Sequence, residues 1–287
     1  MNIAITAPAG PVNLSKLKTG VKRLKSLGYG DISIGESCYS EHRWNSAPAE
    51  IRAAELEDFW CDPEIDLVFA ARGGFGCIHL LDLINWQKMQ QHEKVLCGHS
   101  DVTILHMAFM KYGISRSVSG IMPAVEFASE DLDYFSLVSL QSCLSTNAAI
   151  NLKGEVVRQG LVQGRILPVT LSVFCSLLGS SYMPALKEVV LCLEDINESP
   201  YRLDAYLSQL KISGVLAEVG GLIWGDFSNC GTEEELNFLI EKYSQYVDGP
   251  IIKNVEFGHC LPRMSVPAGN EIIFKVNQGS TIESLVS

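Results

Sequence analysis

The sequence lacks the long hydrophobic runs of a membrane protein and has few basic residues. No segment of the 287-residue chain approaches the roughly 18 consecutive apolar residues that a membrane span needs. Lysine and arginine number 22 against 33 aspartates and glutamates, which gives a formal net charge of −11. Nucleic-acid binding needs a basic face that neutralises phosphates, and the sequence has no Lys/Arg-rich run. We therefore expect neither a membrane span nor a nucleic-acid partner.

The sequence also lacks paired or clustered cysteines. The nine cysteines are odd in number and scattered, with no C-x-x-C pair, and several lie in apolar runs where a thiol behaves as a small hydrophobe. We expect reduced thiols without disulfides, and no metal ion or other cofactor. Residues 1–8 lack the basic region of a signal peptide and predict a first strand instead. The expected location is therefore the cytoplasm.

Strand and helix patterns alternate over the first part of the chain. Apolar runs predict strands at residues 3–7, 32–34, 65–71 and 94–97, and helical spacing predicts helices at 14–27, 49–60, 78–84 and from 102 onward. Strands that are apolar on both faces, in alternation with helices, are typical of a parallel sheet covered by helices. The sequence thus predicts an α/β unit.

The pattern loosens between residues 120 and 159 and becomes regular again near Gly160. Helices are expected at 171–178, 201–210 and 233–246, and strands at 189–193, 221–224, 251–255, 271–276 and 281–285. We therefore divide the chain into an N-terminal α/β domain (1–122), a connector (123–159) and a smaller C-terminal domain (160–287). The functional site is expected between the two lobes.

Ser100 lies in a very short predicted turn, and a turn of this length is expected to expose the serine side chain. Only residues 98–101 (GHSD) separate the strand at 94–97 from the following helix. A serine on such a turn projects at the carboxyl edge of the sheet beside free helix amides, as a nucleophile requires. A helix-capping serine would give the same pattern, and Val102 replaces the second glycine of G-x-S-x-G.

A second candidate is the glycine-rich segment 72–76 (RGGFG), which follows the strand at 65–71. It is compatible with a tight turn, with a phosphate cradle, or with an oxyanion donor. The spacing matches neither G-x-G-x-x-G nor a P-loop. If the strands at 65–71 and 94–97 are neighbours, Gly74 lies beside Ser100, because parallel strands end at one edge of the sheet.

Acids and a histidine follow two strands of the second unit. Glu194, Asp195 and Glu198 close the strand at 189–193, where a carboxylate orients a histidine or caps a helix, and spacing does not choose among the three. His259 follows the strand at 251–255 and is the candidate base. His99 adjoins Ser100, but adjacent side chains in a turn diverge, so it is a poor base for that serine.

Together these segments resemble the LD-carboxypeptidase family of serine peptidases (family S66), which includes the microcin C immunity peptidases. Residues 71–76 resemble the family's A-R-G-G-Y-G, residues 98–101 with Thr103 its nucleophile motif, and 119–122 its S/H-G-P-M stretch. Residues 193–202 resemble L-E-D-x-x-E-x-P-Y-R, 224–230 a G-x-F-x-x-C strand end, and 257–259 the histidine motif. The matches occur in the family's order over nearly the whole chain.

The resemblance implies a fold and a mechanism. The fold would be a flavodoxin-like parallel-sheet N-terminal domain with a smaller β-rich α/β C-terminal domain, commonly in a homodimer. Ser100 would be the nucleophile, His259 the base and Glu194 its orienting acid, with the N–H groups of Gly74 and Asp101 as the oxyanion hole. The implied substrate is the murein tetrapeptide, which loses its terminal D-Ala during cell-wall recycling. Substrate contacts are expected from Arg72, Gly73 and Phe75.

Two departures from the family pattern keep other functions open. Phe75 replaces the customary Tyr, and Pro168-Val169-Thr170 stands where the family has Gly-Gly-Asn. Proline and valine cannot adopt the backbone conformations open to glycine, so that turn would differ. The alternatives are a peptidase acting on peptide–nucleotide or other amide conjugates, as the microcin immunity peptidases do, and a catalytically reduced peptide-binding relative.

Overall fold

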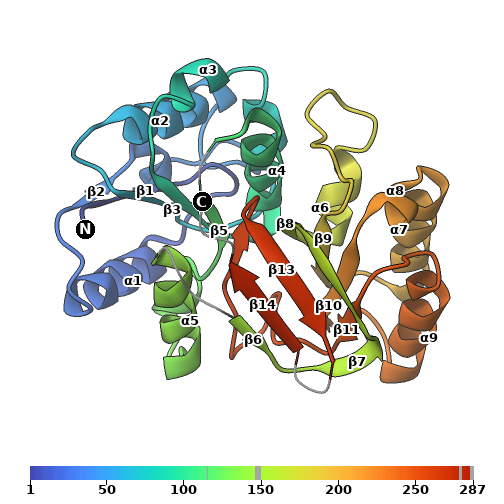
Figure 1. The fold of residues 1–287 in the computed structure, drawn as a ribbon. Coiled ribbons are helices and arrows are strands. Elements are labelled where there is room, and N and C mark those ends of the chain that lie inside the picture. Colours follow the sequence, from blue (N-terminus) through green and yellow to red (C-terminus); the bar gives the residue numbers. More distant parts are fainter. Residues whose placement is uncertain (115, 146–149, 278–279, 285–287) are drawn as a thin grey trace.

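The N-terminal part of the chain is built on a six-stranded sheet (Figure 1). The computed structural model describes residues 1–114, 116–145, 150–277 and 280–284. The strand order is β12-β5-β4-β3-β1-β2, and all pairs are parallel except β12 with β5. The strands are Ile3–Thr6 (β1), Ile32–Ile34 (β2), Leu67–Ala70 (β3), Val95–Cys97 (β4), Ser117–Ser119 (β5) and Val266–Ala268 (β12). The order of β1 to β5 is that of flavodoxin-like folds, as predicted.

Helices cover both faces of this sheet (Figure 1). They are Leu14–Ser26 (α1), Ala49–Cys61 (α2), Trp86–Met89 (α3), Thr103–Tyr112 (α4) and Tyr134–Leu144 (α5). Leu17 of α1 and Leu140 of α5 pack with Phe69 on one face, whereas Trp60 of α2 packs with Val68 on the other. Alternate residues of β3 thus enter two different cores, which is why its sequence is apolar throughout.

The helix predicted at residues 78–84 does not form as one α-helix. Residues 77–80 form a short 3₁₀ helix (Cys77–Leu80), and the next α-helix, α3, begins only after Asn85. The Asn85 side chain accepts a hydrogen bond from the N–H of Lys88 at 3.0 Å. This cap starts a new helix in a different register, so the apolar run at 78–84 does not continue as one α-helix.

The second sheet has eight strands in the order β6-β14-β13-β8-β9-β10-β11-β7. They are Ile150–Leu152 (β6), Glu155–Arg158 (β7), Gly160–Thr170 (β8), Val190–Ile196 (β9), Gly221–Ser228 (β10), Ile251–Lys253 (β11), Glu271–Val276 (β13) and Ser280–Ser284 (β14). Strands β8 to β11 are parallel to one another, and the outer pairs are antiparallel. Leu285, at the end of the strand predicted at 281–285, lies outside the described residues.

Four helices accompany this sheet, on the side away from β13 and β14 (Figure 1). They are Leu171–Ser176 (α6), Pro200–Ile212 (α7), Val215–Glu218 (α8) and Glu233–Ser244 (α9). Thr232 opens α9 with a capping box completed by Glu235. No helix in the described part of the chain is long and apolar enough to cross a membrane.

The two sheets share a hydrophobic core. One cluster of buried side chains includes Leu105 of α4 together with Val169 of β8 and Leu193 of β9. Strand β12, which lies far along the chain, also pairs with β5 of the first sheet. The two halves therefore meet in a packed seam rather than through a flexible linker. The boundaries proposed at residues 122 and 159 stay a prediction.

Candidate active site

Ser100 lies in a strained turn between β4 and α4. It begins a 3₁₀ helix (Ser100–Val102) that runs directly into α4, and its φ is +64°. This conformation is uncommon for a residue with a side chain and persists where the surroundings enforce it. A Cβ on Gly98 would lie 2.8 Å from the Cβ of Ala70, so the chain passes too close to β3 for a larger residue. The turn thus holds a partly exposed serine at the sheet edge.

The glycine loop that follows β3 lies against this turn. A Cβ added to Gly73 would be 2.7 Å from Ser100 Cβ and 2.9 Å from Ser100 Oγ. Gly74 is exposed and has a φ of +127°, and a Cβ there would meet the Cα and N atoms of Gly10 at 2.9 Å. Both positions therefore require glycine. The neighbouring strand ends predicted from the sequence bring this loop and Ser100 together.

The side chain of Asp101 fixes the Ser100 turn to the segment that follows the glycine loop. Its carboxylate accepts a hydrogen bond at 2.8 Å from the N–H of Cys77, just beyond the glycine loop. Burial raises the pKa of Asp101 above its ordinary range. Because the side chain ties the two loops together, the positions of the Asp101 and Gly74 main chains are coupled.

Arg72 and Phe75 flank the glycines and differ in exposure. The Arg72 guanidinium donates hydrogen bonds to the carbonyl oxygens of Gly73 (3.1 Å) and Pro11 (3.2 Å). The ring of Phe75 is 50% exposed and packs edge-to-face on His79, with ring centroids 5.2 Å apart. Arg72 therefore supports the loop, and Phe75 presents an apolar surface to solvent.

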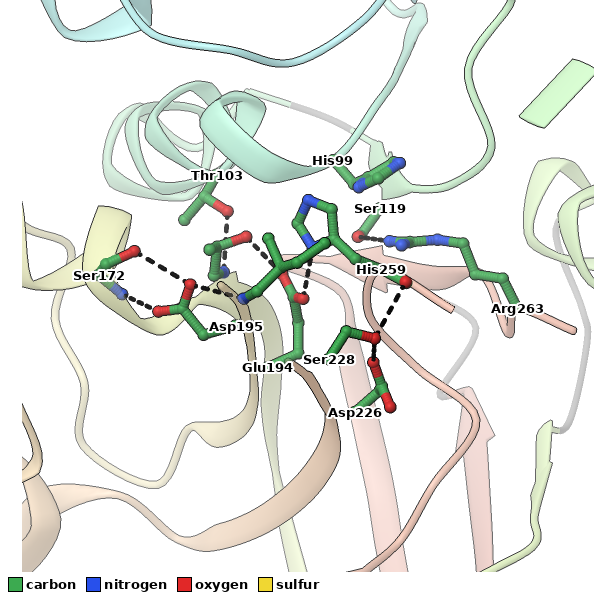
Figure 2. Close-up of polar contacts among 12 residues, drawn as sticks. His99, Thr103, Ser119, Ser172, Glu194, Asp195, Asp226, Ser228, His259 and Arg263 are labelled. Carbon is green, nitrogen blue, oxygen red and sulfur yellow. Dashed lines mark hydrogen bonds and ion pairs between the residues drawn. The ribbon is translucent and has the colours of Figure 1, made fainter. Parts of the chain in front are cut away.

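Glu194 and His259 form a hydrogen-bonded pair at the carboxyl ends of β9 and β11 (Figure 2). Glu194 Oε2 lies 2.7 Å from His259 Nδ1, and the carboxylate is 1% exposed. Burial by itself raises the pKa of Glu194, but the hydrogen bond and charge of His259, followed by Arg263 and Thr170, bring it below its ordinary value. A Cβ on Gly258 would come within 3.0 Å of Glu194 Oε2, so glycine there permits this approach. An ionised carboxylate thus faces Nδ1 of the imidazole.

The other two acids near the end of β9 have different partners. Asp195 accepts a hydrogen bond from the N–H of Ser172 at 2.8 Å and so caps α6. Glu198 binds Arg202 at 2.7 Å. Alternation along the strand sends Glu194 and Asp195 to opposite faces. Of the three acids that the sequence left open, Glu194 is the one that contacts His259.

The segment Pro168-Val169-Thr170 is not a turn in this protein. It forms the end of β8 and pairs with Cys192, Leu193 and Glu194 of β9. The Thr170 hydroxyl donates a hydrogen bond to Glu194 Oε1, and its N–H donates to Thr103 Oγ1 of α4 at 3.1 Å. Sequence reasoning missed this role of Thr170. Thr170 supports the acid while it ties the two halves of the molecule together.

Replacing Thr170 with valine should therefore reduce activity while leaving the fold intact. Valine fills nearly the same volume but removes the donor to Glu194 Oε1, and a lost hydrogen bond to a charged group corresponds to about a 10-fold fall in kcat/KM. The Thr170→Ser variant keeps the hydroxyl and should stay near the wild-type value. The measurement is steady-state hydrolysis of murein tetrapeptide, the substrate that the resemblance implies, by both variants. Wild-type kcat/KM in Thr170→Val would refute the role given to this hydroxyl.

The two groups of residues meet through His99, the residue before Ser100. The ring centroids of His99 and His259 lie 5.0 Å apart, with an angle of 72° between the ring planes. This contact brings the Glu194–His259 pair of the second sheet beside the Ser100 turn of the first (Figure 2). The structure thus gathers at one seam the serine, histidine, acid and glycines that the sequence singled out.

Comparison with known proteins agrees with this arrangement. The LD-carboxypeptidase N-terminal domain matches residues 3–120, and the LD-carboxypeptidase C-terminal domain matches residues 163–273. A Streptomyces coelicolor protein named as a carboxypeptidase is 31% identical, over 93% of this chain and 88% of its own length. A Bacillus subtilis protein named as a murein peptide carboxypeptidase is 28% identical, over 93% of this chain and 86% of its own.

Solved structures show the same fold over the whole chain. The muramoyltetrapeptide carboxypeptidase from Oxalobacter formigenes superposes with a TM-score of 0.90 at 27% identity and covers 100% of both chains. The microcin C7 self-immunity protein MccF has a TM-score of 0.87, covering 99% of this chain and 96% of its own, but at 18% identity this likeness concerns the fold alone. The resemblance inferred from the motifs is therefore confirmed: the chain belongs to the LD-carboxypeptidase family of serine peptidases.

Proposed function

We propose that this protein is a serine carboxypeptidase that cleaves the L,D-amide bond of murein tetrapeptide and releases the terminal D-Ala. The observation that carries the proposal is the buried Glu194–His259 pair, 2.7 Å between Oε2 and Nδ1, at the seam where the strained Ser100 turn lies. A carboxylate on Nδ1 leaves Nε2 of the imidazole as the proton acceptor. The substrate class is supported by the relatives named as murein peptide and muramoyltetrapeptide carboxypeptidases.

The proposed reaction proceeds through an acyl-enzyme. His259 Nε2 takes the proton from Ser100 Oγ as this oxygen attacks the carbonyl carbon at the L-centre of the diamino acid. The C–N bond then breaks, His259 gives the proton to the amine of D-Ala, and an ester remains on Ser100. Water, deprotonated by His259, hydrolyses that ester and restores the serine. The charge on Glu194 stabilises the imidazolium in both halves of the reaction.

The main-chain N–H groups of Gly74 and Asp101 are the proposed oxyanion hole. Gly74 is exposed on a loop in contact with the Ser100 turn, and Asp101 is the second residue of the 3₁₀ helix that Ser100 begins. Donors fixed in this way stabilise the negative oxygen of the tetrahedral intermediate without reorganising during the reaction. Arg72, Gly73 and Phe75, around the same loop, are the proposed substrate contacts.

The Gly74→Ala variant tests the oxyanion assignment. The new Cβ meets Gly10 at 2.9 Å and the φ of +127° disfavours any side chain, so the loop must shift. We expect kcat to fall about 10²- to 10³-fold, as for the loss of one oxyanion donor. Gly28→Ala is the matched control, because Gly28 has a φ of +86° but no atom within 4 Å of an added Cβ. It should lose stability and keep wild-type kcat. Unchanged kcat in Gly74→Ala would contradict the assignment.

The proposed substrate is tested by incubating purified protein with murein tetrapeptide and detecting free D-Ala by mass spectrometry. A tetrapeptide that ends in L-Ala and a pentapeptide that ends in D-Ala-D-Ala are the matched controls, and neither should be cleaved. No release of D-Ala from the tetrapeptide would refute the proposal. A role in cell-wall recycling, a cytoplasmic location and a homodimer remain predictions attached to this function.

A further inference from the structure

A cluster of buried charged and polar side chains lies behind the candidate site and takes no part in the reaction proposed above. His99 comes from the end of β4, Glu126 from a 3₁₀ helix (Glu126–Ala128), and Arg263 from the segment before β12. Their exposed fractions are 3%, 6% and 0%. Burying such groups is costly unless they are paired, so the arrangement calls for an explanation.

Glu126 fixes the orientation and tautomer of His99. His99 Nε2 lies 2.7 Å from Glu126 Oε1, and the second carboxylate oxygen accepts a hydrogen bond from the N–H of Met122 at 2.8 Å. Burial raises the pKa of Glu126, but His99, Arg263 and the Met122 N–H together lower it to about 2. Because the carboxylate is ionised, it accepts a hydrogen bond from Nε2–H of His99. The Nδ1 atom of His99 is then an unprotonated acceptor, and it has no hydrogen-bond partner among the described residues.

Arg263 keeps this imidazole neutral. Its guanidinium donates to Ser119 Oγ at 3.1 Å (Figure 2). It also lies 5.6 Å from the ring centre of Phe257. Burial first, and then the charge of Arg263, lower the pKa of His99 to about 4, against the opposing effect of Glu126. The other titratable groups that face His99 are His259 and, from α4, His106, whose Nε2 binds the carbonyl oxygen of Gly98 at 2.9 Å.

The neutral ring of His99 packs against the ring of His259. The edge-to-face contact, with centroids 5.0 Å apart, joins the immobilised imidazole of His99 to the half-buried imidazole of His259. Glu194 holds one nitrogen of His259, but a single hydrogen bond leaves the ring free to rotate about it. Contact with a second, fixed ring removes that freedom. A neutral His99 does not repel the imidazolium that His259 becomes in the proposed reaction, whereas a charged ring would.

We propose that His99 is a positioning residue, a neutral imidazole locked by Glu126 that holds the ring of His259 in the plane needed for proton transfer with Ser100. The inference rests on the proposed function only in that His259 acts as the base. It concerns the residue directly before Ser100, and its two partners, Glu126 and His259, come from different segments of the chain.

The His99→Gln variant removes the ring and keeps an uncharged N–H donor for Glu126. We expect kcat to fall about 10- to 100-fold with KM within about 2-fold of wild type, because misplacement of a reacting group affects the chemical step. The double variant His99→Phe/Glu126→Gln restores an aromatic ring without stranding a buried carboxylate, and it should recover most of kcat. His92→Gln, a substitution of the same type far from the site, should match wild type. Thermal unfolding of each variant shows that it is folded.

A merely structural role gives a different pattern. It predicts that kcat follows the melting temperature and that the double variant is no better than His99→Gln, and either result would overturn the proposal. Histidine ¹⁵N NMR provides a second readout, with the His99 signal assigned by its loss in His99→Gln. We expect a neutral Nε2–H tautomer at pH 7, and a doubly protonated ring would also overturn the proposal.

A serine-reactive fluorophosphonate separates this inference from the substrate assignment. If wild type labels at Ser100 but does not cleave tetrapeptide, the proposed substrate is wrong, and the labelling rate replaces kcat in the comparison. Slower labelling of His99→Gln, restored in the double variant, then supports His99 as the positioning residue. Equal labelling rates in wild type and His99→Gln refute it, even if the tetrapeptide is cleaved. Wild-type protein that neither cleaves nor labels refutes both.

Discussion

The Ser100→Ala variant is expected to lose at least about 10⁴-fold in kcat/KM for murein tetrapeptide, because no other group in the proposed mechanism can form the acyl-enzyme. The residual rate would come from binding and the oxyanion donors alone. Release of D-Ala by mass spectrometry and labelling by a fluorophosphonate measure the loss. Release of D-Ala at the wild-type rate would show that Ser100 is not the nucleophile.

A second substitution at the same position separates chemistry from strain. The φ of Ser100 is +64°, which glycine adopts without steric cost. Ser100→Gly should therefore be as inactive as Ser100→Ala but more stable than it by about 1 kcal/mol in the free energy of unfolding. Denaturant titration of the two variants is the measurement. Equal stabilities would mean that the turn stores no strain at this residue.

The second large effect is expected from Glu194→Gln, with kcat falling about 10⁴-fold at little cost in folding. The amide keeps the size of the carboxylate but carries no charge to stabilise the imidazolium, and its N–H₂ group can turn His259 to the wrong tautomer. KM should change little, because Glu194 is buried behind His259 and does not face the substrate. Steady-state kinetics on tetrapeptide measure both constants.

The adjacent carboxylate provides a control of the same chemistry. Asp195 follows Glu194 directly in β9. Its side chain accepts hydrogen bonds from Ser172 at the start of α6 and does not contact His259, so Asp195→Asn is the control variant. Burial raises the pKa of Asp195 to about 6, so the group is still mostly ionised at pH 7, but its charge lies on the opposite face of β9 from His259. The variant should keep kcat within a few-fold and lose some stability. A larger loss of kcat in Asp195→Asn than in Glu194→Gln would reverse the assignment of the orienting acid.

Strands β1 to β4 of the first sheet could be predicted from the sequence, whereas β5 and β12 were not. Its strands are covered by helices on both sides, so burial imposes continuous apolar runs such as β3 that are easily recognised. The proximity of the glycine loop and Ser100 followed from one rule, that neighbouring parallel strands end at the same edge, although the residue against Ser100 is Gly73 and the prediction named Gly74. The short β5 was not predicted, because three residues in the middle of an irregular segment carry too little pattern.

Strand β8 was missed for a different reason. Its inner half contains Pro168, which normally argues against a central strand. Residues 166–170 pair with β9, whereas the pairing with β13 ends at Arg165, so the proline interrupts no ladder on that second edge. Only the tertiary structure supplies this information. The doubt attached to Pro168-Val169-Thr170 came from treating these residues as a loop.

The polar contacts behind the site could not be predicted from local pattern. Glu194 competed with Asp195 and Glu198 until the strand geometry gave each a separate partner. His99 was considered only as a base for Ser100, and its partner Glu126 lies in a segment without a recognisable motif. Contacts between distant segments depend on how the two sheets dock, and one sequence does not encode that docking in any short window.

The seam between the two sheets has a consequence for synthesis of the protein. Ser100 leaves the ribosome early, whereas Glu194, His259 and strand β12 emerge much later, and β12 must pair with β5 to complete the first sheet. A nascent chain that has folded only β1 to β5 therefore presents Ser100 without the proposed base, and in the proposed mechanism it cannot hydrolyse peptides. In the proposed mechanism, competence for hydrolysis arises only when the late segments dock. Truncated products that lose the residues after β11 would be inert, because they lack His259.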